Sequence, residues 1–300
     1  MSQAPTPSAT TQSWLAIAPT LFVLLWSTGF VGMRLGIPYA EPFTFMALRM
    51  GLVVTLLLAA SWLAGARWPA SPGEAGHAAV AGLLVHATYL SGVLFAIQWG
   101  LPLGYVALIA GLQPILTALL ARFALGERLG ARQKTGMALG LAGVAMVVLS
   151  QQRSAAATTA WPAFAAAGVA LLGITLGTLY QKRFCSHLDI RTGGVIQFAA
   201  TGAVLTALSL AFESQTVHWT GQFVFALLWL SLVLSIGAIS LLYLMIRHGA
   251  ASAVVSLFFL TPAVTAVMAY ALFDEFLPPL AVGGLLVSAI GVALVLRNRS

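Results

Sequence analysis

The chain is a succession of long apolar stretches separated by short polar ones. Runs such as Val53–Ala60 and Val282–Leu296 contain no charged residue. A helix needs about 20 residues to cross the hydrocarbon of a bilayer, and a transmembrane barrel would alternate apolar and polar residues instead. The pattern therefore predicts an all-α membrane protein with ten transmembrane helices, near 14–33, 42–64, 78–98, 104–122, 134–150, 160–181, 191–212, 220–244, 252–272 and 279–296.

The composition excludes most other classes of protein. Of 300 residues, 60% are hydrophobic and only 7% are charged, whereas soluble domains carry about 25% charged residues. Too few polar side chains are present to cover a soluble enzyme, and the chain is too apolar to be disordered. The single cysteine, Cys185, excludes an internal disulfide. We expect no cofactor and no metal, and a small molecule and the lipid bilayer as the partners of a monomer.

The first residues are predicted to lie outside the membrane. Residues 1–13 are rich in Pro, Ser and Thr and contain no Lys or Arg, so we expect a disordered tail. The apolar segment that follows is long and lacks both a basic flank and a cleavage site. It is therefore interpreted as a retained span and not as a signal peptide.

The distribution of charge predicts the orientation in the membrane. Basic residues concentrate in cytoplasmic loops. With the N-terminus in the cytoplasm, the outside loops hold only Arg34 and Arg153, and Arg49 lies within a span. The inside segments then hold Arg67, Arg122, Arg128, Arg132, Lys134, Lys182, Arg183, Arg191, Arg247, Arg297 and Arg299. Both termini are predicted to be cytoplasmic, in a bacterial inner membrane, and no continuous basic stripe suggests nucleic acid binding.

Two segments of the chain resemble each other at an offset of 148 residues. Residues 105–147 align with 253–295, and the identities include Pro114 with Pro262 and Glu127 with Glu275. We therefore predict two five-helix repeats, 14–150 and 160–296. Because five is odd, the second repeat would enter the membrane inverted. Inverted repeats form a binding site near the midplane, where rocking of one half against the other gives alternating access.

The repeated motif resembles a known family. The segment LGERLGARQKTGMALGLAGVAMVV, with Pro114 on the preceding helix, is similar to the EamA family of the drug/metabolite transporter superfamily. The second copy, FDEFLPPLAVGGLLVSAIGVALVL, follows Pro262, and WSTGFVGMRLG resembles the opening of the first repeat. The resemblance implies ten helices, cytoplasmic termini and export of small metabolites from a central cavity. Members include the YddG-type exporters of aromatic amino acids.

Ionisable residues inside the spans are the first candidates for the site, because they are costly in lipid. Every Asp and Glu maps to a loop or a helix end, so no carboxylate proton relay is evident and a facilitator is expected. His86 shares a helix face with Tyr89 and either lines a cavity, titrates as a coupling group, or bonds a backbone carbonyl. Arg49 either pairs structurally, snorkels, or recognises a substrate carboxylate.

Aromatic and amide side chains are further candidates. Packing or lipid contact is the alternative for each of them, because aromatic residues also form belts at span ends and threonines bond their own helix. Pro114 and Pro262 are interpreted as paired hinges or as static kinks. The predicted substrate-binding set is Trp26, Thr28, His86, Tyr89, Trp99, Gln113, Thr178, Gln197 and Tyr243, where Gln197 stands at the position of Arg49 under the offset.

The function predicted from these features is secondary transport. The chain contains no G-x-S-x-G nucleophile motif, no intramembrane aspartate pair and no ATP-binding G-x-x-x-x-G-K-[ST] loop, so an enzyme is not expected. We expect export of small amphipathic metabolites, most of all aromatic or other neutral amino acids. A multidrug or cation exporter is the alternative, followed by a proton-coupled antiporter that uses His86 and by a channel.

Overall fold

A computed structural model describes residues 9–125, 130–152, 160–238, 241 and 260–296. In these ranges the regular structure is helical, apart from one isolated β-bridge between Ala40 and Val217. The elements are α1 (Ala9–Gly36), η1 (Ile37–Tyr39), α2 (Pro42–Leu63), α3 (Pro72–Gly82), η2 (Leu83–Thr88), α4 (Tyr89–Gln98), α5 (Leu103–Gly111), α6 (Gln113–Leu125), α7 (Ala131–Gln152), α8 (Ala160–Phe184), α9 (Ile190–Phe212), α10 (Gly221–Leu228), η4 (Trp229–Ala238), α13 (Thr261–Phe273) and α14 (Pro279–Leu296).

The all-helical membrane architecture predicted from the sequence is confirmed. Within the described residues, seven helices are long and apolar enough to cross a bilayer. They are Ile17–Tyr39, Pro42–Leu63, Pro72–Gln98, Ala131–Ser150, Trp161–Phe184, Ile190–Phe212 and Gly221–Ala238. Leu103–Thr117, Thr261–Phe273 and Pro279–Leu294 are shorter apolar helices at positions where further spans were expected. The helix of the first span begins at Ala9, so residues 9–13 are helical and do not form part of a disordered tail.

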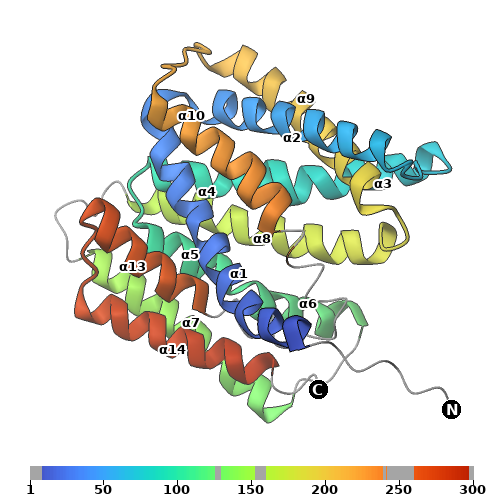
Figure 1. Cartoon of the computed structure of the whole chain (residues 1–300). Coiled ribbons are helices and arrows are strands. Elements are labelled where there is room, and N and C mark those ends of the chain that lie inside the picture. Colours follow the sequence, from blue (N-terminus) through green and yellow to red (C-terminus); the bar gives the residue numbers. More distant parts are fainter. Residues whose placement is uncertain (1–8, 126–129, 153–159, 239–240, 242–259, 297–300) are drawn as a thin grey trace, which may run out of the picture.

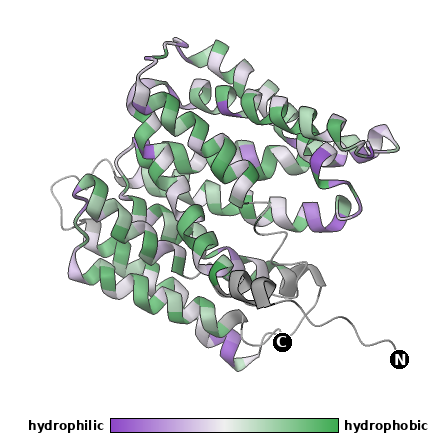
Figure 2. Ribbon diagram, in the orientation of Figure 1, coloured by the Kyte–Doolittle hydropathy of each residue, from purple (hydrophilic) through white to green (hydrophobic). Residues whose placement is uncertain are grey.

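The helices form one bundle with a helix pair at each edge (Figure 1). The pair α2 and α9 lies at one edge, the pair α7 and α14 lies at the other, and α1, α4, α8 and α10 run between them. Hydrophobic residues cover the helix lengths and hydrophilic residues gather mainly at the ends (Figure 2). This distribution is expected for helices that are surrounded by lipid along their sides.

A proline interrupts the expected span 104–122. Pro114 has no N–H to donate to the carbonyl four residues earlier, so α5 ends at Gly111 and α6 begins at Gln113. The turn between them is tighter, with Leu112 N donating to Ile109 O at 3.1 Å. Pro262 likewise is the second residue of α13. Both prolines therefore mark the start of a helix, where their fixed φ is tolerated.

Glycine allows α7 and α14 to pack very closely in an antiparallel arrangement. A Cβ added to Gly291 would lie 2.5 Å from Gly136 O, and one added to Gly284 would lie 2.5 Å from Gly143 O. Gly136, the earlier residue of α7, thus lies against Gly291, the later residue of α14, so the two helices run antiparallel. Small residues on both helices let the two backbones touch, which is a common way for helices to associate in a bilayer.

The ends of α2 and α9 are joined by polar contacts. The Glu213 carboxylate, just after α9, accepts hydrogen bonds from Phe43 N and Thr44 N at the start of α2, both at 2.7 Å. Glu41, just before α2, accepts from Ser214 N at 2.7 Å. The first N–H groups of a helix lack partners within the helix and favour negative charge. The Glu213 carboxylate therefore stabilises the start of α2, and Glu41 joins the loop after α9 to the same end of the helix pair.

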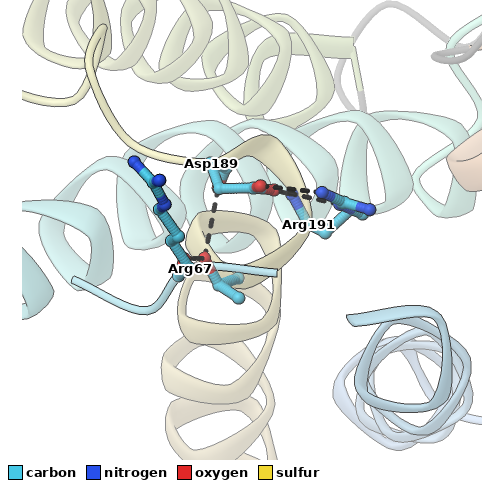
Figure 3. Close-up of polar contacts among 4 residues, drawn as sticks. Arg67, Asp189 and Arg191 are labelled. Atoms are coloured by element: carbon cyan, nitrogen blue, oxygen red, sulfur yellow. Dashed lines mark hydrogen bonds and ion pairs between the residues drawn. The ribbon is translucent and has the colours of Figure 1, made fainter. Parts of the chain in front are cut away.

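The other end of the same helix pair is also capped. Asp189 precedes α9, accepts from Arg191 N at 2.9 Å and forms an ion pair with the Arg191 guanidinium at 2.9 Å (Figure 3). Its hydrogen bonds with Arg191 lower the pKa of the Asp189 carboxyl. Thr192 Oγ1 donates to Arg67 O at 2.6 Å and so ties the start of α9 to the loop after α2.

We predict that Gly284→Ala destabilises the protein. The added methyl group would overlap the backbone of α7, and overpacking of this kind costs about 1–3 kcal/mol. The melting temperature in detergent, followed by tryptophan fluorescence, should fall. Gly168→Ala in α8 is the control, because nothing lies within 4 Å of its added Cβ. Equal melting temperatures for the two variants would contradict the close packing of α7 and α14.

Candidate functional site

A cavity lies between α1, α2, α4, α8, α9 and the two π-helical segments η2 and η4. Its empty space, including the mouth, is about 620 Å³. The wall is mostly apolar, with a few polar side chains, which is the usual composition of a small-molecule site. The lining residues are Trp26, Gly29, Phe30, Met33, Arg49, Val85, His86, Tyr89, Leu90, Val93, Ile174, Phe198, Leu234 and Ser235.

Two π-helical segments contribute to this wall. Val85 and His86 belong to η2, and Leu234 and Ser235 belong to η4. In each segment a hydroxyl bonds the carbonyl five residues earlier, as Ser235 does with Leu230 at 3.0 Å. The wider turn changes the direction of the side chains that follow, and π-helical turns are frequent at functional sites. The sequence analysis expected regular helices here.

Glycines bring these segments against their neighbours. A Cβ on Gly177 of α8 would lie 2.5 Å from the Val85 side chain, and a Cβ on Gly29 of α1 would lie 2.8 Å from the Leu234 side chain. Larger residues at these positions would displace the π-helical segments. The glycines therefore fix the width of the cavity on two sides.

The predicted pair His86 and Tyr89 does lie on the cavity wall. The His86 ring stacks on Phe198, with centroids 4.1 Å apart and an interplanar angle of 18°. Gln197, which is buried, lies near His86. The imidazole is thus held by one aromatic and one amide neighbour, and both of these come from α9. Substrate binding by His86 and Tyr89 stays a prediction.

Helix α1 supplies an aromatic face to the cavity. Trp26, Phe30 and Met33 follow helical spacing, so their side chains point to the same side and all three line the cavity. Thr28 points elsewhere, because its hydroxyl accepts from Trp229 Nε1 at 2.8 Å and donates to Leu25 O at 2.6 Å. The structure therefore separates Trp26 from Thr28, which the sequence analysis grouped together.

Arg49 is the cationic side chain among the cavity-lining residues. Only 3% of its surface is exposed. Its Nη2 atom donates to Ser235 Oγ at 3.2 Å, whereas Nε and Nη1 have no hydrogen-bond partner. Snorkelling to the helix end is therefore not observed. No described carboxylate forms an ion pair with this guanidinium.

Trp99, Gln113 and Thr178 lie outside the cavity lining. Gln113 Nε2 donates to Thr178 Oγ1 at 3.0 Å, so these two residues contact each other. Trp99 is 46% exposed at the end of α4 and packs against Phe95. Pro114 and Pro262 lie at helix starts, as described above. Tyr243 lies outside the described residues.

Several lining residues were missed by the sequence analysis. Phe30 and Met33 could have been found from their spacing after Trp26, which is typical of one helix face. Leu90 and Val93 follow His86 and Tyr89 in the same way. Ser235 and Phe198 belong to distant segments, and nothing local in the sequence distinguishes them from other apolar or hydroxyl positions.

Residues 13–149 match the EamA-like transporter family. The match covers a little under half of the chain, 137 of 300 residues. A probable terminal-alkyne amino-acid exporter of Streptantibioticus cattleyicolor is 26% identical over 94% of this chain and 93% of its own length. The uncharacterized transporter YvbV of Bacillus subtilis is 25% identical over 93% of this chain and 90% of its own length.

The chain is also similar to a third relative over part of its length and to a solved structure over nearly all of it. A probable amino-acid metabolite efflux pump of Escherichia coli is 28% identical over 56% of this chain and 53% of its own length. A solved crystal structure superposes with a TM-score of 0.64 at 21% identity and covers 96% of this chain and 99% of that one. The structural likeness shows a shared fold. Seven long apolar helices within the described residues make this chain a multi-pass membrane protein.

We predict that the cavity admits water-soluble reagents. With Cys185 replaced by Ser, Leu234→Cys should react with a small methanethiosulfonate reagent, because Leu234 lines the cavity. Leu205→Cys should stay unmodified, because Leu205 is 1% exposed in the apolar core. Mass spectrometry of the labelled protein measures both. Equal labelling of the two positions would contradict an open cavity at η4.

Proposed function

We propose that this chain is an EamA-like transporter that exports small amphipathic metabolites, most of all aromatic or other neutral amino acids, by alternating access through the cavity. The observation that carries the proposal is the lining itself. Trp26, Phe30 and Phe198 offer flat apolar surfaces, while His86, Tyr89 and Arg49 offer polar contacts. Aromatic faces with a few hydrogen-bonding groups suit a flat solute with one polar end. The amino-acid exporters among the similar proteins support the same solute class.

An inverted duplication would allow alternating access, and the spacing of the helices supports such a duplication. Helices α2 and α9, α6 and α13, and α7 and α14 begin 148 residues apart, the same offset that relates the two sequence segments. The α7–α14 contact is reciprocal under this offset, because Gly136 meets Gly291 and Gly143 meets Gly284. A two-fold relation between repeats 14–150 and 160–296 would produce such a pattern.

The charge of the two bundle ends supports cytoplasmic termini. Hydrogen bonds join Glu41 to Ser214 and Leu103 N to Glu275. Glu275 also forms an ion pair with Arg34 near the end of α1, so these acidic loops share one end. Contacts of Thr192 with Arg67 and of His187 with Glu74 join the loops of the opposite end, which holds Arg67, Lys182, Arg183 and Arg191. Since basic loops remain in the cytoplasm, the second end would be cytoplasmic.

The described lining residues include no carboxylate, which supports facilitated transport. Acidic side chains at the described helix ends bond helix termini or basic partners, as Glu213, Glu275 and Asp189 do. His86 is the titratable alternative for proton coupling. Net export would then follow the gradient of the solute itself.

We predict that purified protein in liposomes takes up aromatic amino acids with saturation and counterflow. Trp26→Ala should lower the apparent affinity roughly threefold to tenfold, the range expected for the loss of one aromatic contact. Trp62→Ala is the control, because Trp62 is 82% exposed at the end of α2. Initial uptake rates of labelled phenylalanine and tryptophan are measured over a range of concentrations and compared between the wild type and the two variants.

The same panel distinguishes the alternatives. Uptake that never saturates and shows no counterflow would indicate a channel. Transport confined to permanently charged drugs would replace the proposal with a multidrug exporter. If Trp26→Ala and Trp62→Ala behaved alike, the cavity would not be the binding site.

We predict that transport of a neutral amino acid moves no stoichiometric protons. The fluorescence of a pH-sensitive dye inside the liposomes should remain constant while labelled phenylalanine accumulates. His86→Gln, which keeps hydrogen-bonding groups but does not titrate in this range, should leave the absence of proton movement unchanged. One proton moved per solute, abolished in His86→Gln, would establish coupling through His86 instead.

A further inference from the structure

The guanidinium of Arg49 is the feature of the cavity that the proposed function leaves unexplained. Arg49 is nearly fully buried, and only Nη2 is used, in a bond to Ser235. Nε and Nη1 retain N–H donors without acceptors. Buried charges are normally paired, because burying an unpaired ion is costly. A group of this kind at the wall of a ligand cavity is expected to find its partner in the ligand.

The protein itself offers this arginine no anion within the described residues. The described carboxylates lie at helix ends, where Glu41, Glu213, Glu275 and Asp189 accept bonds from backbone N–H groups. Ser235 is a neutral partner, and its own hydroxyl donates to Leu230 O, so its lone pair remains for Arg49. Ser235 thus orients the guanidinium without neutralising it.

We propose that Arg49 recognises a carboxylate of the transported solute, and that the solute is an amphipathic monocarboxylate whose amino group need not be charged. This inference rests on the proposed function and specifies its substrate class. Guanidinium groups bind carboxylates through short charge-assisted hydrogen bonds. The apolar body of the solute would lie against Trp26, Phe30 and Phe198, which line the same cavity.

The second part of the proposal follows from what the wall lacks. Within the part of the chain that the structure describes, the polar side chains of the wall besides Arg49 are His86, Tyr89 and Ser235, and no lining residue there is acidic. An ammonium group would find only neutral acceptors and would be repelled by Arg49. An acylated or absent amine avoids that repulsion. Amino acids, their N-acyl derivatives and the corresponding deamino acids should therefore all bind, whereas carboxamides should not.

The difference between the two halves at one pair of equivalent positions predicts the orientation of the bound solute in the cavity. Arg49 and Gln197 stand at equivalent positions under the 148-residue offset. Arg49 lines the cavity and carries a charge, while Gln197 is a neutral amide beside His86. Only one of the two equivalent positions can therefore form an ion pair, and the carboxylate would lie toward α2 and η4.

The test compares solutes and variants in parallel. Labelled phenylalanine uptake into liposomes is measured in competition with 3-phenylpropanoate, N-acetylphenylalanine and phenylalaninamide. For the wild-type protein the two acids should compete, and the amide should be at least tenfold weaker. Arg49→Gln should weaken both acids at least tenfold, and Arg49→Lys should restore part of the loss. Arg67→Gln removes the same charge from an exposed position and should change affinities less than twofold.

The melting temperature distinguishes a binding role of Arg49 from a structural one. If Arg49 stabilised the fold, its replacement would lower the melting temperature. Without solute, Arg49→Gln should melt at the same or a higher temperature than the wild type, because an unpaired buried charge is removed. Phenylpropanoate should raise the melting temperature of the wild type but not that of Arg49→Gln. A lower melting temperature for Arg49→Gln together with unchanged acid affinity would overturn the assignment.

The outcomes separate this inference from the proposed function. Transport in which acid and amide compete equally, with no effect of Arg49→Gln, overturns the inference and leaves amphipathic export standing. If no solute of the panel is transported, the proposed function fails, and the melting-temperature shifts with phenylpropanoate still decide whether Arg49 binds a carboxylate.

Discussion

Antiparallel packing of helices that lie 148 residues apart in the sequence is the constraint on which the rest of the structure depends. It holds α2 against α9 and α7 against α14 at the two edges of the bundle. The contacts require glycine where backbones meet, as at Gly143 and Gly284, and carboxylates where helix ends meet, as at Glu213. With both edges fixed, α1, α4, α8 and η4 enclose the cavity between them.

The described acidic side chains lie at the ends of the bundle, away from the cavity, because they find hydrogen-bond partners there. The first N–H groups of a helix lack partners within the helix and favour negative charge, so acidic side chains bond them at the bundle ends. Glu213 and Glu275 bond the starts of α2 and α5 in this way, and Glu41 bonds the loop after α9. Arg49 differs, because it is buried among cavity-lining residues with donors to spare. A charge that the fold does not compensate is available to a ligand.

The sequence predicted the seven long apolar helices of the described residues, because hydrophobic length decides them, but it did not predict the break between α5 and α6. It also placed Trp26, His86 and Tyr89 on the cavity wall, since each is a polar or aromatic side chain within an apolar helix. It did not predict the π-helical segments, because these depend on packing against Gly29 and Gly177 in other helices. For the same reason the sequence alone could not connect Ser235 with Arg49, which is 186 residues away.

The central claim is that the two halves are inverted around a shared cavity, and the sidedness of two equivalent loops tests it most directly. Pro38 and Ser186 are exposed and lie 148 residues apart. Each is replaced by Cys in a Cys185→Ser background, and intact cells are treated with a membrane-impermeant maleimide. The account predicts labelling at position 38 in intact cells and at position 186 only after permeabilisation. Labelling of both positions from the same side would contradict it.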